Sequence, residues 1–127
     1  MAVLPEITLR LPNNPGALAG VCGLLSAERV NILALGLDAS GHLHLVVDNH
    51  VHGAAALREH HHQITERDVI VTVVANAPDG LASVLRLVAA ADVNVEYAYA
   101  GGSGGSPTAV AVLGVDDAAR AATAAGV

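Results

Sequence analysis

One short sequence pattern occurs twice in this chain at a fixed offset. Asn13-Asn14-Pro15-Gly16-Ala17-Leu18-Ala19 is matched by Asn76-Ala77-Pro78-Asp79-Gly80-Leu81-Ala82. At the offset that separates Pro15 from Pro78, identical residues recur for Asn13, Pro15, Leu18, Ala19, Val21, Leu24, Ala27, Val30 and Asn31. A fixed internal spacing of this length indicates a duplicated supersecondary unit. In each copy the pattern is that of a strand end, a tight turn with Pro and Gly, and a helix start. Such a turn can bind a small anion without any catalytic side chain.

The composition limits the classes of function open to the chain. With 127 residues, each copy would have a marginal core of its own. We therefore expect the copies to pack on each other, on a second chain, or both. The net charge is −6 with only six Lys and Arg residues, and aromatic residues make up 2%. A nucleic-acid-binding protein needs a basic surface, so we expect no nucleic-acid partner.

The cellular location follows from what the sequence lacks. The single cysteine, Cys22, cannot form an internal disulfide, which is consistent with a reducing cytoplasm. The N-terminus has no basic segment followed by an apolar run, so a signal peptide is not expected. No apolar stretch approaches the length of a membrane-spanning helix, so we expect no membrane partner. The sequence predicts a cytoplasmic protein.

Hydrophobic periodicity predicts a similar order of elements in both copies. In the first copy we expect strands and helices at Ile7–Leu11, Leu18–Glu28, Asn31–Leu37, His42–Asp48 and Gly53–His62, with a short extended segment at Gln63–Arg67. In the second copy they are Val69–Val74, Pro78–Ala90, Val93–Ala100, Thr108–Leu113 and a helix at Asp116–Ala125 capped by Asp116. This order predicts an α+β fold with antiparallel sheets and helices on one face.

These residues resemble the ACT domain. The resemblance is carried by Asn14-Pro15-Gly16-Ala17-Leu18-Ala19, a helix ending in Leu24-Leu25, and Val30-Asn31-Ile32, and again by Ala77-Pro78-Asp79-Gly80-Leu81-Ala82 and Val93-Asn94-Val95. It covers essentially the whole chain, which is similar to small stand-alone proteins with two ACT domains in tandem. The resemblance implies two ferredoxin-like βαββαβ repeats, residues 1–66 and 67–127, the second with a short or absent closing strand. It also implies a regulatory, non-enzymatic protein that binds an amino acid at an interface between units.

The chemistry of the turn agrees with this implication. Pro15 suits the first helical position, and Gly16 and Ala17 leave the backbone accessible to a ligand carboxylate. A neutral amino acid is therefore the expected ligand, and the simpler alternative is a capped helix start with no ligand. The expected ligand-binding residues are Asn13, Asn14, Pro15, Gly16, Ala17, Leu18, Asn31, Ile32, Asn76, Ala77, Pro78, Asp79, Gly80, Leu81, Asn94 and Val95. Asp79 replaces the Gly16 of the first copy, so the two sites need not be equivalent.

Two alternatives from other classes stay open. One is an interaction subunit without a working ligand site, which regulates a biosynthetic enzyme by contact alone. The other is a ferredoxin-like module that binds a metal through its seven histidines, including His42, His44 and the run His60-His61-His62. No metal-binding motif such as HExxH is present, so we expect neither a metal nor a cofactor. No nucleophile motif supports catalysis either.

Self-association is expected from two apolar segments. Asn31–Leu37 and Val69–Val74 are apolar on both faces. A sheet with helices on one side cannot cover both faces of such strands. We therefore expect a homodimer or a higher even assembly that buries part of these strands and borders the ligand turns.

Overall fold

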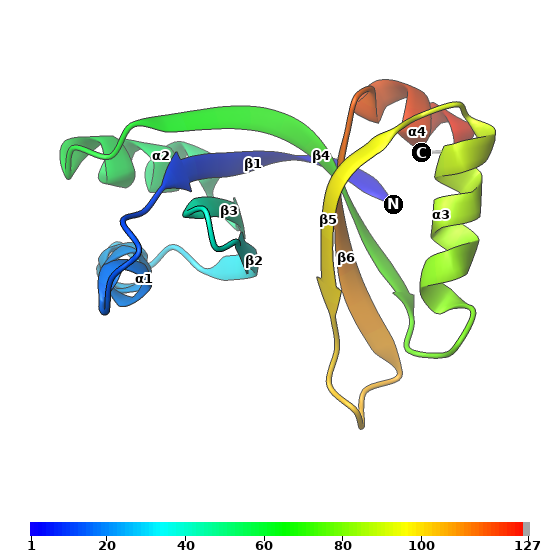
Figure 1. The fold of residues 1–127 in the computed structure, drawn as a ribbon, viewed down its shortest axis with the longest axis horizontal. Helices are drawn as coiled ribbons and strands as arrows, with labels where there is room; N and C mark the ends of the chain where they lie inside the picture. The colour runs from blue at the N-terminus through cyan, green and yellow to red at the C-terminus, as the bar shows by residue number, and fades with distance from the viewer. Residues whose placement is uncertain (126–127) are drawn as a thin grey trace. The chain divides into compact units, whose positions relative to one another are not determined.

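The computed structural model describes residues 1–125, which form six strands and four helices (Figure 1). In chain order these are β1 (Ala2–Arg10), α1 (Ala17–Ala27), β2 (Ile32–Leu37), β3 (His42–Val47), α2 (His50–Glu59), β4 (Ile64–Ala75), α3 (Gly80–Ala90), β5 (Val95–Gly101), β6 (Thr108–Val115) and α4 (Ala118–Ala124). The strands follow the order β2-β3-β1-β4-β6-β5 in an antiparallel sheet. The predicted α+β class is confirmed.

The chain divides into two compact units that exchange a strand segment. One unit is Pro5–Arg67, and the other combines Met1–Leu4 with the residues from Asp68 onward. β1 and β4 therefore each contribute residues to both units. Residues 1–4, which a division at residue 66 assigns to the first repeat, lie with the second unit. In the sheet order β1 is the neighbour of β4, so residues 2–4 provide the strand segment beside β4 in this unit.

The unit Pro5–Arg67 buries one face of its strands beneath α1 and α2. Ile7 lies opposite Leu45, and Leu9 opposite Leu43, across β1 and β3. Since alternate residues of a strand face the same side, these four share one face. They pack with inward residues of both helices, so that the buried core comprises Ile7, Leu9, Leu11, Val21, Leu25, Val30, Leu43, Leu45, Val47, Ala54 and Leu57.

The second unit has its own aliphatic core beneath α3 and α4. Ile70 of β4 lies opposite Leu113 of β6. The N-terminal Met1 packs against this core, which explains why Met1–Leu4 belongs to this unit. The buried residues are Ile70, Val88, Val93, Leu113, Val115, Ala121 and Ala122. Short aliphatic side chains thus fill both cores in a chain without Trp or Phe.

The starts of α2 and α4 have side-chain caps that the sequence analysis did not predict. α4 begins at Ala118, and its cap is Asp117, whose carboxylate accepts from the Arg120 amide, so the prediction of Asp116 as the cap is wrong. Asp116 instead accepts a hydrogen bond from the Asn94 amide at 3.0 Å. α2 begins at His50 rather than at the predicted Gly53, because the Asn49 side chain caps it through the His52 amide.

The two segments that carry the repeated sequence pattern also share a backbone conformation at the ends of α1 and α3. Arg29 and Asp92, which occupy equivalent positions in the two copies, both have φ of 57°. In each copy the next residue returns a hydrogen bond to the helix, from Val30 N to Leu25 O at 2.9 Å and from Val93 N to Val88 O at 3.3 Å. The two units therefore share a helix ending that sequence identity alone did not reveal.

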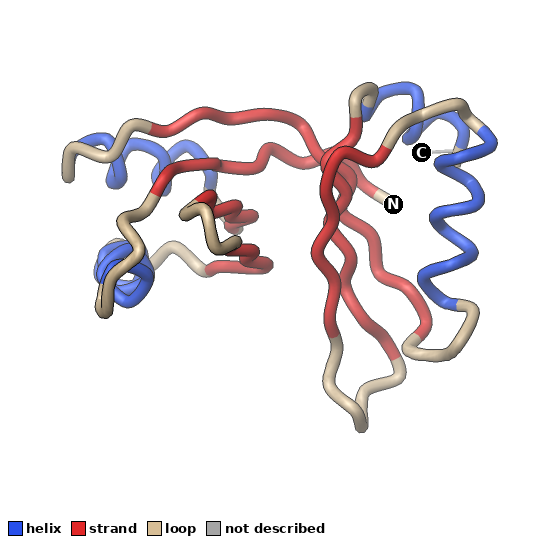
Figure 2. The backbone as a smooth tube through the Cα atoms, viewed as in Figure 1, coloured by secondary structure: helices blue, strands red, loops and turns tan. Residues whose placement is uncertain are grey.

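The two hairpins differ in length. β2 and β3 are joined by residues 38–41, whereas β5 and β6 are joined by residues 102–107, which form the long loop in Figure 2. Among residues 1–125, no helix is both long enough and apolar enough to cross a membrane.

Candidate ligand site at the first turn

The first turn joins β1 to α1 and ends at Gly16, the N-cap residue of α1. Gly16 has φ of 86°, in the left-handed region that glycine adopts readily, and no side chain caps the helix. The first amides of a helix have no intrahelical partner, and here no capping side chain satisfies them. The prediction that Pro15 is the first helical residue is wrong, because Gly16 lies between Pro15 and the helix.

Two hollows flank the first turn. One of about 80 Å³ lies between the turn and the β2–β3 hairpin, and it is lined by Leu11, Pro12, Asn13, Asn14, Ala17, Leu18, Leu37, Asp38, Ala39 and Gly41. A more open hollow of about 410 Å³ follows the start of α1 as far as Gly20, Val21 and His62. Six predicted site residues are thus brought together around these hollows: Asn13, Asn14, Pro15, Gly16, Ala17 and Leu18.

The second turn carries a charge that is already paired. Asp79 is the N-cap residue of α3, yet its side chain makes no capping bond. Its carboxylate accepts from the Ser83 hydroxyl at 2.7 Å and from Arg86 Nη2 at 3.0 and 3.1 Å. The Ser83 hydrogen bond and then the Arg86 guanidinium lower the pKa of Asp79. A ligand carboxylate approaching α3 would therefore meet an ionised aspartate.

The first turn has no counterpart to this charged group. At the positions equivalent to Asp79, Ser83 and Arg86, the first copy has Gly16, Gly20 and Gly23. A Cβ added at any of these three glycines would meet no other atom within 4 Å. The start of α1 is therefore uncharged, whereas the start of α3 carries the paired Asp79 beside a hollow of about 310 Å³ that Gly80 and Ser83 help to line.

The second turn is also tied to its own hairpin loop. The Asn76 side-chain amide donates to Ser103 O and to Ser106 O, both at 2.9 Å, and the Asn76 backbone amide donates to Pro107 O at 3.0 Å. Asn13 is the equivalent residue of the first copy. Among the described residues, the side chains of Asn13 and Asn14 make no hydrogen bond. The polar side chains of the first turn are therefore available to a ligand.

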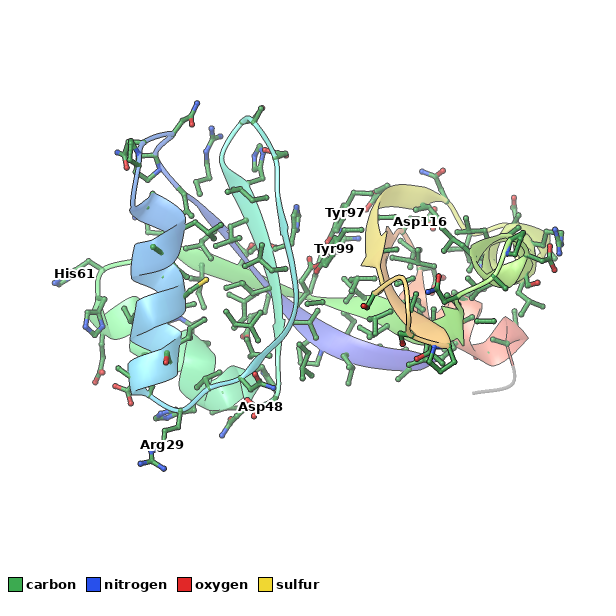
Figure 3. All side chains as sticks on the ribbon, turned by 90° about the horizontal axis from the view of Figure 1, so that it is seen from below. Arg29, Asp48, His61, Tyr97, Tyr99 and Asp116 are labelled. Carbon is green, nitrogen blue, oxygen red and sulfur yellow. The ribbon has the colours of Figure 1, made fainter. Side chains whose placement is uncertain are left out.

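Asn31 and Ile32 follow the end of α1 in the chain, so they lie away from the first turn, which precedes that helix. Arg29 and Asp48, labelled in Figure 3, lie near this end of α1. The Asn31 amide donates to Asp48 Oδ1 at 2.9 Å, and the Asp48 amide donates back to Asn31 O at 3.0 Å. Asn94 and Asp116 repeat this exchange at 3.0 and 3.2 Å. Within each unit, the start of the second strand is therefore separated by the length of a helix from the turn that was expected to share its ligand. This applies to Asn31 and Ile32 in one unit and to Asn94 and Val95 in the other.

The histidines are dispersed rather than clustered. Four of them face different carboxylates: His42 and Asp38 at 3.3 Å, His44 and Glu6 at 3.1 Å, His50 and Glu66 at 3.3 Å, and His52 and Glu28 at 3.1 Å. In the part of the chain that the structure describes, no group of three or more His, Cys, Asp and Glu residues could hold a metal ion. The arrangement therefore gives no support to the metal-binding alternative.

Sequence reasoning missed the contribution of the β2–β3 hairpin to the first turn. Leu37 and Asp38 line the 80 Å³ hollow although they lie well beyond the turn in the sequence. The run Asp38-Ala39-Ser40-Gly41 did contain a signal, because an Asp shortly before a Ser is typical of a turn closed by its own side chain. That pattern predicts the local turn, but it does not predict that the hairpin lies beside the first turn.

Comparison with known proteins identifies the fold. No protein-family model and no curated protein matches the chain. Among solved structures, protein BT0572 from Bacteroides thetaiotaomicron matches with a TM-score of 0.87 and 25% identity, over 98% of this chain and 87% of that one. The ligand-free regulatory subunit of aspartate kinase from Thermus thermophilus matches with a TM-score of 0.70 and 18% identity, over 98% and 92%. The chain has the ACT-like fold of such regulatory subunits.

A longer enzyme contains the same fold as a part. Aspartokinase III from E. coli, solved in complex with lysine and aspartate, matches with a TM-score of 0.59 and 16% identity over 95% of this chain but only 31% of that chain. The Thermus thermophilus match is itself named a regulatory subunit. The ACT-like chain is thus similar to regulatory subunits and to a fraction of a complete kinase.

Proposed function

We propose that this protein is a non-enzymatic regulatory protein of the ACT type that binds a small neutral amino acid at its first turn. One observation carries the proposal: the first turn is uncapped, uncharged and flanked by two hollows, whereas the second turn carries the ionised Asp79, paired with Arg86, and its Asn76 is hydrogen-bonded to the hairpin loop. Helix amides without partners favour a carboxylate. Similarity to aspartate kinase regulatory subunits supports the regulatory role.

In this proposal the two turns have different roles. The first turn holds the ligand through residues 13–18, and the second turn stabilises its own hairpin. Asn31 and Ile32 follow the end of α1 that is opposite the first turn, so they would contribute only to a site bordered by a second copy. In this proposal, a biosynthetic enzyme that the protein regulates is a further partner.

Ligand binding is expected to stabilise the folded chain. A ligand at 100 times its dissociation constant should raise the unfolding free energy by about 2.7 kcal/mol. Thermal melts of the full chain with each of the twenty amino acids at millimolar concentration would measure this effect. We expect a shift with small neutral amino acids only. The absence of a shift with every amino acid would favour the interaction-subunit alternative.

A matched pair of variants tests the position of the site. A side chain is strained at the left-handed φ of Gly16, but Asp and Asn adopt this region more readily than most residues, so the strain should be similar in the two variants and the charge is what differs. Gly16→Asp introduces the charge that the second turn has at Asp79, and it should remove most of the ligand-induced stabilisation. Gly16→Asn has a similar shape without the charge and should retain it. Equal loss in both variants would argue against carboxylate binding at this turn.

We also propose that the chain forms a homodimer or a higher even assembly. Leu33 on β2 and Val73 on β4 are 51% and 65% exposed, which leaves large apolar side chains uncovered on both strands. Light scattering at micromolar concentration should give at least twice the mass of the 12.7 kDa chain. Leu33→Lys or Val73→Lys should lower this mass, whereas Val51→Lys on α2, at a side chain 69% exposed, should not. A monomeric wild-type protein would exclude the assembly.

A further inference from the structure

The hollow of about 310 Å³ between β4 and α3 combines an aliphatic lining with two hydroxyl groups. The aliphatic lining includes Val74, Val84 and Leu87, and the hydroxyl groups belong to Thr72 and Ser83. All of the lining residues belong to the unit that contains α3 and α4, and none of their side chains is charged. A concave, mainly apolar surface with a few polar groups is typical of a small-molecule site.

Thr72 presents its hydroxyl group to this hollow, although the residue is only 6% exposed. It lies two residues after Ile70, which packs in the core beneath α3, so both side chains are on the same face of β4. The Thr72 hydroxyl makes no hydrogen bond within residues 1–125. Because no fully buried side-chain oxygen or nitrogen of these residues lacks a partner, the Thr72 oxygen is reached from the hollow. Polar groups in buried residues are normally hydrogen-bonded, so its partner has to enter the hollow.

The first copy has larger, apolar residues at the equivalent positions. Leu9 and Leu11 correspond to Thr72 and Val74 in the repeated pattern, and both leucines are buried in the core of their unit. Threonine and valine have less side-chain volume than leucine, so the second copy fills less of the space beneath its helix. Threonine also brings a hydroxyl group to a position that is aliphatic in the first copy. The polar anchor of this hollow is therefore specific to the unit that contains α3.

We propose that this hollow binds a small, uncharged aliphatic molecule whose single hydroxyl or carbonyl group forms a hydrogen bond with Thr72. The volume equals that of about ten water molecules in the liquid, which is enough for a ligand of about six to eight non-hydrogen atoms. Val74, Val84 and Leu87 contact its aliphatic part. A carboxylate or an ammonium group would lose hydration here without gaining an ion pair from a lining side chain. This site is separate from the amino-acid site proposed at the first turn, which belongs to the other unit.

Two variants of Thr72 separate the hydrogen bond from the space. Thr72→Val removes the hydroxyl group and keeps the branched shape, and it breaks no hydrogen bond within the described residues, so the chain should fold. Thr72→Leu introduces the residue of the first copy and should fill the hollow. Thr108→Val is the matched control, because Thr108 is an exposed residue of β6 in the same unit and does not line the hollow. Titration of the full chain with 1-pentanol and with pentanoate, followed by amide chemical shifts in NMR spectra, measures both affinity and position.

We expect 1-pentanol at millimolar concentration to shift the amide signals of Val74, Ser83 and Leu87. Thr72→Val should weaken its binding about 5-fold, as for one hydrogen bond between uncharged groups, Thr72→Leu should abolish binding, and Thr108→Val should have no effect. Absence of these shifts would mean that water alone pairs with Thr72 and would overturn the proposal. Equal affinity of Thr72→Val and the wild type would overturn the Thr72 contact. Binding of pentanoate as tight as that of 1-pentanol would overturn the uncharged ligand class.

Discussion

Replacing Gly80 with alanine is expected to lower the unfolding free energy by about 3 kcal/mol, the upper range for overpacking a close contact. A Cβ at Gly80 would fall well inside contact distance of the Ala75 carbonyl oxygen. The carbonyl belongs to the backbone, so no flexible side chain can move away. Ala75 is also held in register opposite Thr108 of β6, so α3 or the end of β4 would have to shift.

Gly20→Ala provides the matched control in the other copy. Gly20 lies within α1, and a Cβ there would meet no other atom within 4 Å. Since glycine in a helix interior is less stable than alanine, this variant should gain about 0.5–1 kcal/mol. Urea unfolding followed by circular dichroism would give both values. A Gly80→Ala variant as stable as the wild type would show that the turn can relax.

Deleting Met1–Leu4 is expected to lower the unfolding free energy of the unit that follows Arg67 by about 3 kcal/mol. The reason is that the removed strand residues lose their ladder hydrogen bonds, each of which contributes about 1 kcal/mol. These residues form an edge strand of that unit, and Met1 packs against its core. Hydrogen exchange should show the greatest loss of protection in β4 and β6, with Leu43 and Leu45 of the other unit retaining more.

The exposed residue Val3 offers a conservative control for the deletion. Val3 is 37% exposed, so Val3→Ala keeps the strand backbone and removes little buried surface. It should leave the exchange pattern close to that of the wild type. Equal loss of protection in both units after the deletion would contradict the assignment of Met1–Leu4 to one unit.

Local patterns in the sequence predicted most of the helices and strands, but they did not predict that β1 and β4 each have residues in both units. The turn residues and helical spacing placed α1 and α3 close to their observed bounds, because capping and amphipathicity are local properties. The merger of Ile64–Arg67 with the next strand was not predicted. Thr65, Glu66 and Arg67 are polar and indicate a junction, whereas their strand conformation depends on β1, which lies far earlier in the chain.

The residues of the candidate site could likewise be predicted only where they carry a local sequence signal. The first turn carries its own signal in Asn14-Pro15-Gly16, so its residues could be named from the sequence. The contribution of the β2–β3 hairpin and the role of Asn76 could not, since each depends on a contact between segments that are distant in the sequence. Displacement of the glycine by one position also has a structural reason. Gly16 is required for its left-handed φ, whereas Gly80 is required by the nearby Ala75 carbonyl.

The exchange of strand segments also bears on how a regulatory signal could spread through this protein. β1 and β4 each contribute residues to both units, so each unit contains strand segments whose backbone continues into the other unit. We expect opening of one unit to weaken the other in part, because the backbone of β1 and of β4 continues from one unit into the other. An amino acid bound at one turn would then suppress fluctuations in both units by mass action. Coupling of this kind acts through local opening and needs no hinge.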